Sequence, residues 1–341
     1  MLASDLHVHL DGSLRESTLV ALAREVGLAP SSDDGSEFAR RLRFSPGMSL
    51  TSCLSRFEVT VGLLQTKRAL ERVAAELVAD CYLDGVRHAE LRFCPALHTR
   101  EGLSQADAVT AVMSGLQVGT AQATASAPGD RMSAVVVVSV LEGMSEEQTG
   151  ELVDLAIRFA DSGVAGVDLA GDEALFDPER HARPFSRASD AGLGVTVHAG
   201  EGGDASNVVA AVEELGANRI GHGVSASTDA GAMALLADRN VAVEICLSSN
   251  LHTGAVESLA SHPLCVLANA GVPVVLATDN RFFSNTTLSH EYELAGAEAG
   301  AGAEILLGSI RTSAEAAFLP NDQRSVLREL YTGSADDSGE E

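Results

Sequence analysis

Several residue types are scarce in this chain of 341 residues, and each shortage narrows the class of protein. Tryptophan is absent and aromatic residues make up only 4% of the chain, so Ala, Val and Leu must provide most of the core packing. Lys and Arg number 23 against 48 Asp and Glu, which gives a net charge of −25. Such an acidic surface repels phosphate backbones and anionic lipids, so we expect no nucleic acid partner and no membrane partner. A small-molecule substrate fits this charge.

Cysteines are few and scattered, and apolar runs are short. The five cysteines form no C-x-x-C pair, which is typical of free thiols in a reducing compartment, so we expect a cytoplasmic protein. They are Cys53, Cys81, Cys94, Cys246 and Cys265. The N-terminus lacks the apolar core of a signal peptide. The longest β-branched apolar run, Ala134 to Val138, is too short to span a bilayer.

Short apolar runs alternate with amphipathic helical patterns along the chain. Apolar residues at helical spacing predict one helix over residues 70–81 that ends at Gly85. The run Ser145-Glu-Glu-Gln148 predicts a capping box at the start of another helix, which ends at Gly163. Between the helical patterns, valine-rich runs predict strands at about residues 5–9, 86–93, 134–140, 165–168, 194–198, 218–221, 241–246 and 273–278.

The alternation of strands and helices predicts an α/β fold with a parallel sheet covered by helices. Eight such units close naturally into a (β/α)8 TIM barrel, and we expect residues 1–332 to form one such domain. A doubly wound open sheet is the alternative fold. It would require a glycine-rich phosphate loop after the first strand, whereas the chain has Asp-Gly-Ser-Leu-Arg-Glu-Ser at residues 11–17.

Two segments depart from the alternation. Residues 29–54 contain loop-like and turn-like runs and are interpreted as an insertion after the first strand, helical in part and lying over the barrel mouth. Residues 333–341 are rich in Gly, Asp and Glu and are interpreted as an acidic disordered tail.

Histidines and one aspartate lie at the ends of predicted strands, which is where active sites form in these barrels. His7 and His9 end the first strand, and their spacing of two places both side chains on one face. His198, His222 and Asp279 end the fifth, sixth and eighth strands. These five side chains should therefore converge on one rim, although each short motif alone is a weak signal.

Imidazoles with a carboxylate predict a site for a divalent transition metal, zinc above all. A catalytic zinc lowers the pKa of a bound water towards ~7, and a carboxylate that is not a ligand must then move protons. Glu201, three residues after His198, suits that role. Asp11 is either a functional residue or a helix N-terminal residue favoured by the dipole. The other histidines are interpreted as ordinary core or surface residues; they are His88, His98, His181, His252, His262 and His290.

The ordered motifs together resemble the adenosine deaminase family of the amidohydrolase superfamily. They are His7-Val-His-Leu-Asp-Gly12, Asp168-Leu-Ala-Gly-Asp-Glu173, His198-Ala-Gly-Glu201, Gly221-His-Gly223, Cys246-Leu-Ser-Ser-Asn250 and Thr278-Asp279. Any one of them is a modest signal, but six in the correct order are highly specific. The resemblance extends from about Asp5 to the helix around residues 313–318.

The resemblance implies roles for particular residues. One zinc ion per subunit would be held by His7, His9, His198 and Asp279. Glu201 would protonate purine N1, and His222 would orient the attacking oxygen and stabilise its charge. His9 would also line the substrate site. Asp11 would bind the 5′ hydroxyl of the ribose, and the backbone N–H of Gly171 would bind purine N3, where a side chain would crowd the ring.

Two positions depart from the family pattern. Asn280 stands where a second aspartate commonly contacts purine N7; an amide can still donate to N7. The Thr278-Asp-Asn-Arg281 run resembles variants among bacterial members, particularly actinobacterial ones. The third strand ends in Ser139-Val-Leu-Glu-Gly143, where many members carry a basic pair, and this difference either shapes the pocket or is neutral drift.

The resemblance implies zinc-dependent hydrolysis of adenosine and 2′-deoxyadenosine to the inosine products and ammonia. The same chemistry on aminodeoxyfutalosine, adenine or an N6-modified nucleoside is the alternative, and the residues around Phe57 to Leu64 should decide among them. A barrel that only binds nucleosides is a remote alternative. Zinc deaminases that act on bases in nucleic acid use P-C-x-x-C, which this chain lacks.

Overall fold

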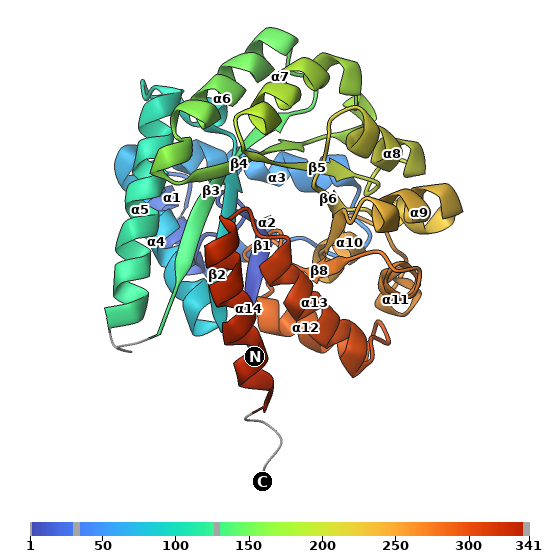
Figure 1. The fold of residues 1–341 in the computed structure, drawn as a ribbon. Helices are drawn as coiled ribbons and strands as arrows, with labels where there is room; N and C mark the ends of the chain where they lie inside the picture. The colour runs from blue at the N-terminus through green and yellow to red at the C-terminus, as the bar shows by residue number, and fades with distance from the viewer. Residues whose placement is uncertain (1, 30–34, 126–129, 337–341) are drawn as a thin grey trace.

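The strands form one parallel sheet in the computed structural model, which describes residues 2–29, 35–125 and 130–336. Each strand pairs with the next in chain order. They are β1 Ala3–His9, β2 Val86–Phe93, β3 Ser133–Leu141, β4 Val164–Ala170, β5 Gly194–Ala199, β6 Arg219–His222, β7 Ala242–Ile245 and β8 Val274–Leu276. The His9 N–H donates to the Asp279 carbonyl and the Asp279 N–H donates to the His7 carbonyl, both at 2.7 Å. The sheet therefore closes into the predicted (β/α)8 barrel, and the doubly wound alternative is excluded (Figure 1).

Helices surround the barrel (Figure 1). They are α1 Glu16–Glu25, α2 Ser36–Leu42, α3 Leu50–Leu63, α4 Lys67–Leu83, α5 Gln105–Ala125, α6 Glu146–Arg158, α7 Pro178–Asp190, α8 Ala205–Glu213, α9 Ala230–Asp238, α10 Leu247–His252, α11 Leu264–Asn269, α12 Leu288–Ala297, α13 Ala303–Glu315 and α14 Asn321–Asp336. Within the described residues, none has the length and apolar character needed to cross a bilayer.

The predicted strand boundaries lie within two residues of those observed. The last strand is shorter than expected, because β8 ends at Leu276 rather than residue 278. Thr278 turns away from the strand ladder and donates its hydroxyl to Asp5 at 2.6 Å, and Asp279 takes a left-handed φ of 56°. The chain thus leaves β8 early and presents Asp279 at the barrel mouth.

Local sequence signals fix the start of α6 and the end of α4 as predicted, but not the end of α6. The Ser145 hydroxyl accepts from the Gln148 N–H at 3.2 Å, and the Gln148 side chain accepts from the Ser145 N–H at 3.0 Å. These two bonds satisfy N–H groups that the first turn of α6 leaves without helical partners. Gly85, with a φ of 88°, follows the end of α4. The prediction that Gly163 ends α6 was wrong, because α6 ends at Arg158 and Gly163, with a φ of 124°, follows the short 3-10 helix Ala160–Ser162. Such angles suit glycine.

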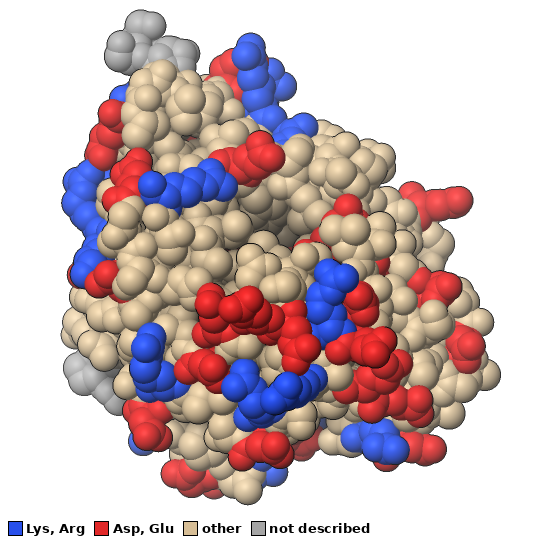
Figure 2. All heavy atoms as spheres, turned by 90° about the horizontal axis from the view of Figure 1, so that it is seen from above, with Lys and Arg blue, Asp and Glu red and all other residues tan. Residues whose placement is uncertain are grey.

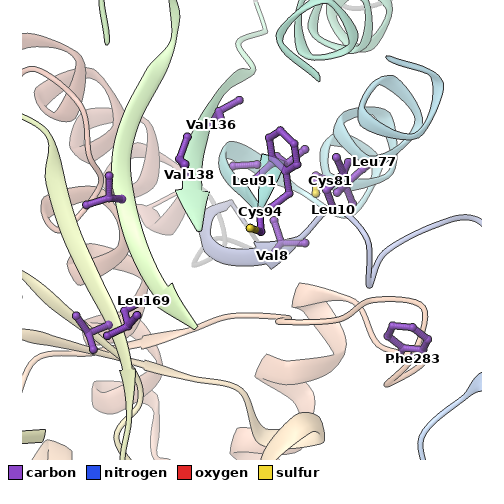
Figure 3. Packing of buried hydrophobic residues seen from close by; sticks show 14 of the residues in the cluster. Val8, Leu10, Leu77, Cys81, Leu91, Cys94, Val136, Val138, Leu169 and Phe283 are labelled. Atoms are coloured by element: carbon purple, nitrogen blue, oxygen red, sulfur yellow. The ribbon is translucent and has the colours of Figure 1, made fainter. Parts of the chain in front are cut away.

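Successive side chains of β1 alternate between the hydrophobic core and the face that carries the two histidines. Val8, between the two histidines of β1, belongs to the main core, in which Leu10 packs beside Leu77 and Cys81 of α4 (Figure 3). Each fully buried side chain of this size stabilises the fold by roughly 1.5–3 kcal/mol. Burial of Val8 in this core therefore places the side chains on either side of it on the opposite face of β1.

The insertion after β1 is partly helical and reaches the barrel mouth, as predicted. Its ring cluster joins Phe44 to Phe283 with centroids 4.8 Å apart, and Phe57 to Phe283 at 4.7 Å. Phe57 also lies 6.2 Å from the His9 ring. The boundary at residue 54 was wrong, because α3 continues to Leu63. Part of the predicted loop, residues 30–34, lies outside the described residues.

The C-terminal helix continues past the point where the acidic tail was expected to begin. Helix α14 runs to Asp336, so residues 333–336 are helical and the boundary at residue 333 is corrected. Leu327 and Tyr331 are buried in a small core cluster, and the Tyr331 hydroxyl lies 2.8 Å from that of Ser4. These contacts fix the helix to β1. Residues 337–341 lie outside the described residues.

Candidate active site

Three histidines and one aspartate meet at the carboxyl ends of β1, β5 and β8. The Asp279 Oδ1 lies 3.2 Å from His7 Nε2 and 3.3 Å from His9 Nε2. His9 Nε2 also lies 3.3 Å from His198 Nε2. Four ligand atoms placed tetrahedrally about 2.0–2.1 Å from a zinc ion stand roughly 3.3 Å apart. The spacing of these atoms therefore fits one tetrahedral metal ion.

The chemistry of the donor atoms supports the same interpretation. His7 Nε2 is buried and has no hydrogen-bond partner among the described residues. Its other ring nitrogen, Nδ1, lies 2.8 Å from Glu244 Oε2, and His198 Nδ1 lies 3.0 Å from Asp168 Oδ1. A histidine that donates through Nδ1 presents a lone pair on Nε2, as metal-binding histidines do. The group thus has the donor set that a divalent metal requires, and His7 and His198 are held in the tautomers that such a metal requires.

A second group of potential ligands overlaps the first. Atoms of His7, His198, His222 and Asp279 lie within 4.8 Å of one another, so His222 competes with His9 as a fourth ligand. We favour His9, because its Nε2 has two contacts at the tetrahedral separation. His222 instead approaches Glu201, with Nε2 3.5 Å from Oε2.

Buried arginines hold the two orienting carboxylates ionised. Arg92 lies 3.0 Å from Glu244 and 3.5 Å from Asp168, and Arg219 lies 2.5 Å from Glu244. Burial alone would raise the pKa of Glu244, but Arg92 and Arg219 bring this pKa well below its usual value. Burial likewise opposes ionisation of Asp168, yet His198 and Arg92 lower its pKa. Both carboxylates can therefore accept from the histidines above them.

Glu201 lies beside the metal cluster without belonging to it. Its Oε1 accepts a hydrogen bond from the Thr253 hydroxyl at 2.9 Å, while Oε2 faces His222. Burial raises the pKa of Glu201 to about 8, and the charge of Asp279 adds to this effect. A carboxyl group with a raised pKa can carry a proton at neutral pH.

Glu173 holds the loop that carries Glu201. Its carboxylate accepts from the N–H groups of Gly200, Glu201, Gly202 and Gly203 at 2.5, 3.0, 2.7 and 2.9 Å. Only an ionised carboxylate offers enough lone pairs for so many donors. The sequence motif that ends in Glu173 therefore positions the motif that contains Glu201.

The predicted substrate residues Asp11 and Asn280 both have a buried side-chain oxygen that finds no hydrogen-bond partner in the described part of the chain. Burial raises the pKa of Asp11 to about 7. A Cβ on Gly12 would come within 1.8 Å of the Asn280 Oδ1, so this glycine allows Asn280 its position. Unsatisfied buried oxygens are costly, and a polar ligand that donates to them would remove that cost.

Gly171 requires glycine for a reason that the sequence did not indicate. Its φ of 117° is strained for any other residue, whereas a Cβ would meet nothing in the protein nearer than the Glu142 backbone nitrogen at 3.4 Å. Beside it, both oxygens of Glu142 and the His181 Nε2 are buried, and none of them has a hydrogen-bond partner among the residues that the structure describes. These two groups lie 3.7 Å apart.

Sequence reasoning missed several residues of this site. Glu244 interrupts the otherwise apolar strand β7, and that interruption was the available signal. Ser249 donates to Asp279 Oδ2 at 2.6 Å, and Asn250 contacts His222. Both lie in the Cys246–Asn250 motif, to whose residues the resemblance assigns no role. Glu173 ends the Asp168–Glu173 motif, and the resemblance assigned it no role either.

Comparison with known proteins shows the family of this chain. The family model described as adenosine deaminase matches residues 3–332. An adenosine deaminase of Mycobacteroides abscessus is 39% identical over 335 residues, which cover 94% of this chain and 91% of that protein.

Solved structures share the fold over nearly the whole chain. The adenine deaminase of Arthrobacter aurescens has a TM-score of 0.86 and 25% identity, and the match covers 98% of this chain and 99% of that one. The N6-mAMP deaminase of Arabidopsis has a TM-score of 0.86 and 27% identity, covering 98% of each chain. With the family model matched from end to end and the site assembled as described, the chain belongs to the adenosine deaminase family and is a hydrolytic deaminase.

Proposed function

We propose that this protein is a zinc-dependent deaminase that converts adenosine and 2′-deoxyadenosine to inosine and 2′-deoxyinosine with release of ammonia. The observation that carries the proposal is the tetrahedral spacing of His7, His9, His198 and Asp279 with Glu201 beside them. These four residues would hold the zinc. When bound, zinc supplies a nucleophilic oxygen at neutral pH by lowering the pKa of water.

Glu201 would protonate purine N1, which makes C6 electrophilic. Its raised pKa of about 8, caused by burial, supports a protonated carboxyl group before the reaction. His222, 3.5 Å from Glu201, would donate a hydrogen bond to the oxygen that adds to C6. A donor placed where negative charge develops stabilises the transition state more than the substrate.

The residues around the pocket would orient the nucleoside. Asp11 would bind the 5′ hydroxyl of the ribose, and the N–H of Gly171 would bind N3. Asn280 would bind N7. Purine N7 can only accept, so the Asn280 amide N–H would donate to it. The buried Asp11 oxygen without a partner among the described residues supports contact with a ligand donor, and Asp11 specifically favours a nucleoside over a free base.

A panel of 6-aminopurines, followed by ultraviolet absorbance, tests the substrate. Adenosine and 2′-deoxyadenosine should give the highest kcat/KM. An equal or higher value for adenine, aminodeoxyfutalosine or an N6-modified nucleoside would replace adenosine as the proposed substrate. These comparisons matter because similar structures include an adenine deaminase and an N6-mAMP deaminase. The Asn280→Asp variant should change KM across the panel while retaining zinc.

Metal analysis tests the remaining alternative, a barrel that only binds nucleosides. The purified protein should contain one zinc per chain and lose activity when zinc is removed. A protein that is inert with zinc restored, towards every purine of the panel, would support the binding role instead. The cytoplasmic location stays a prediction, supported by the five free cysteines.

A further inference from the structure

A row of buried polar groups extends from His222 away from the metal cluster. The Asn250 Nδ2 lies 3.1 Å from His222 Nδ1, and the Asn250 Oδ1 lies 3.2 Å from His262 Nε2. The backbone N–H of Leu264 donates to His262 Nδ1 at 3.1 Å. His222, Asn250 and His262 are at most 5% exposed. The row thus joins the sixth strand end to α10 and to the start of α11.

The backbone N–H of Leu264, at the far end of the row, determines which atom donates in each hydrogen bond of the row. The Leu264 N–H can only donate, so His262 Nδ1 must accept and the ring proton of neutral His262 must lie on Nε2. His262 Nε2–H then donates to Asn250 Oδ1, which turns the amide group towards His222. Burial lowers the pKa of His262 to about 4, so the ring is neutral at physiological pH.

We propose that Leu264, His262 and Asn250 form a relay that fixes His222 in the tautomer with its proton on Nε2. Asn250 donates to His222 Nδ1, which leaves the Nε2–H pointing towards Glu201. A protonated Nε2 cannot bind a metal, so the relay also keeps His222 out of the ligand set although it lies close enough to join.

The relay makes Asn250 and His262 positioning residues, since they act through His222. Its catalytic consequence rests on the proposed function: a fixed Nε2–H donor is available to the oxygen that adds to the purine. The opposite tautomer would aim a lone pair at that oxygen and lose the hydrogen bond. Removal of one such donor lowers kcat by about 10²–10³ in other enzymes.

Nuclear magnetic resonance of protein labelled with ¹⁵N-histidine tests the tautomer directly in the zinc-loaded enzyme. The His222 signals are identified by their loss in His222→Gln. We expect a proton on Nε2 and none on Nδ1. In Asn250→Asp the side chain can only accept, so Nδ1 of His222 should gain a proton. A proton on Nδ1 in the unaltered protein, or none there in Asn250→Asp, would overturn the relay.

Kinetics separate a relay from simple structural support. Asn250→Asp should lower kcat by about tenfold or more with KM within about twofold, because only the donor in the transition state changes. Asn250→Ala leaves both tautomers open and should lower kcat less. If alanine lowers kcat more than aspartate does, Asn250 is merely structural. Asn240→Asp adds the same charge at an exposed position outside the row and serves as the control.

Two substitutions of His262 test the next link. His262→Gln can still donate to Asn250 Oδ1, so the His222 Nε2 proton should persist, whereas His262→Leu should yield a mixture of tautomers. Equal spectra for the two variants would remove His262 from the relay. The relay and the proposed function can fail separately. If only the relay is wrong, the enzyme deaminates its substrate but His222 carries its proton on Nδ1. If only the proposed function is wrong, His222 carries its proton on Nε2 but the enzyme turns over none of the 6-aminopurines.

Discussion

At the scale of single residues, Glu201 is the side chain whose replacement is most informative. Glu201→Gln keeps the size and the possibility of a contact with Thr253 but cannot deliver a proton. We expect kcat to fall by about 10²–10⁴ while zinc stays bound, the usual range for loss of an acid–base group. Steady-state kinetics with metal analysis checks this. Glu214→Gln makes the same change at an exposed position and should have no effect; near-normal turnover in Glu201→Gln would assign the proton transfer elsewhere.

The buried carboxyl group of Glu142 should make the stability of the fold depend on pH. Burial, with the charge of Glu173 added, raises its pKa in the folded protein to about 8 from 4.5. Between these values the folded state binds more protons than the unfolded state, so stability must fall as pH rises from about 4.5 to about 8. The loss is bounded by about 4–5 kcal/mol, since each pKa unit is equivalent to about 1.4 kcal/mol.

Thermal unfolding of Glu142→Gln at several pH values tests this contribution. Glutamine does not ionise, so the variant should gain in melting temperature relative to the unaltered protein at pH 8.5 and gain less at pH 5. Glu147→Gln removes an exposed carboxylate nearby, and its effect on the melting temperature should be the same at pH 8.5 and at pH 5. A gain that does not depend on pH would show that Glu142 is already neutral, or already charged, throughout the range.

At the scale of elements, the loop after β5 depends on one carboxylate from the loop after β4. Glu173→Gln replaces one acceptor oxygen by a donor, which then faces N–H groups of residues 200–203. We expect kcat to fall between about tenfold and a hundredfold, because small displacements of a reacting group have effects of this size.

Amide hydrogen exchange gives a second measurement for that loop. The N–H groups of Gly202 and Gly203 should exchange faster in Glu173→Gln. Asp172→Asn is the matched control, because within the described ranges the Asp172 side chain accepts only from the nearby Ala174 N–H, at 3.2 Å. Unchanged exchange together with normal kcat would mean that the loop holds its position without this carboxylate.

At the scale of the whole molecule, the candidate metal ligands join β1 and β5 to the segment after β8, while the hydrophobic core lies elsewhere. Removal of zinc with a chelator should therefore leave the barrel folded by circular dichroism but lower its melting temperature. A bound ligand stabilises by about 4 kcal/mol at a thousand times its dissociation constant. In Asp279→Ala, added zinc should no longer raise the melting temperature; full zinc retention by that variant would remove Asp279 from the ligand set.

The surface charge is also a property of the whole molecule. Acidic side chains form clusters interspersed with basic ones on the face shown in Figure 2, and the net charge is −25. Solubility is a sufficient explanation for such a surface. Inside the barrel the pattern differs, because Arg92 and Arg219 are buried against carboxylates. The charges that matter for the site are therefore the internal ones.

Local patterns account for what the sequence predicted well. The strand positions, the capping box at Ser145 and the placement of His7 and His9 on one face follow from periods of two and of 3.6 residues, which neighbouring residues determine alone. The boundary errors have tertiary causes. Tyr331 packs against Ser4 and extends α14, and Thr278 bonds to Asp5 and shortens β8.

The amino-acid order by itself determined the alternation of strands and helices, the candidate ligands and the family. Only the tertiary structure decided which groups face each candidate site residue: Glu244 beneath His7, Glu173 around the Glu201 loop, and Asn250 behind His222. The physical reason is the separation along the chain of the residues that interact. Secondary structure depends on residues a few positions apart, whereas each of these contacts joins residues 28 to 237 positions apart and exists only once the barrel has closed.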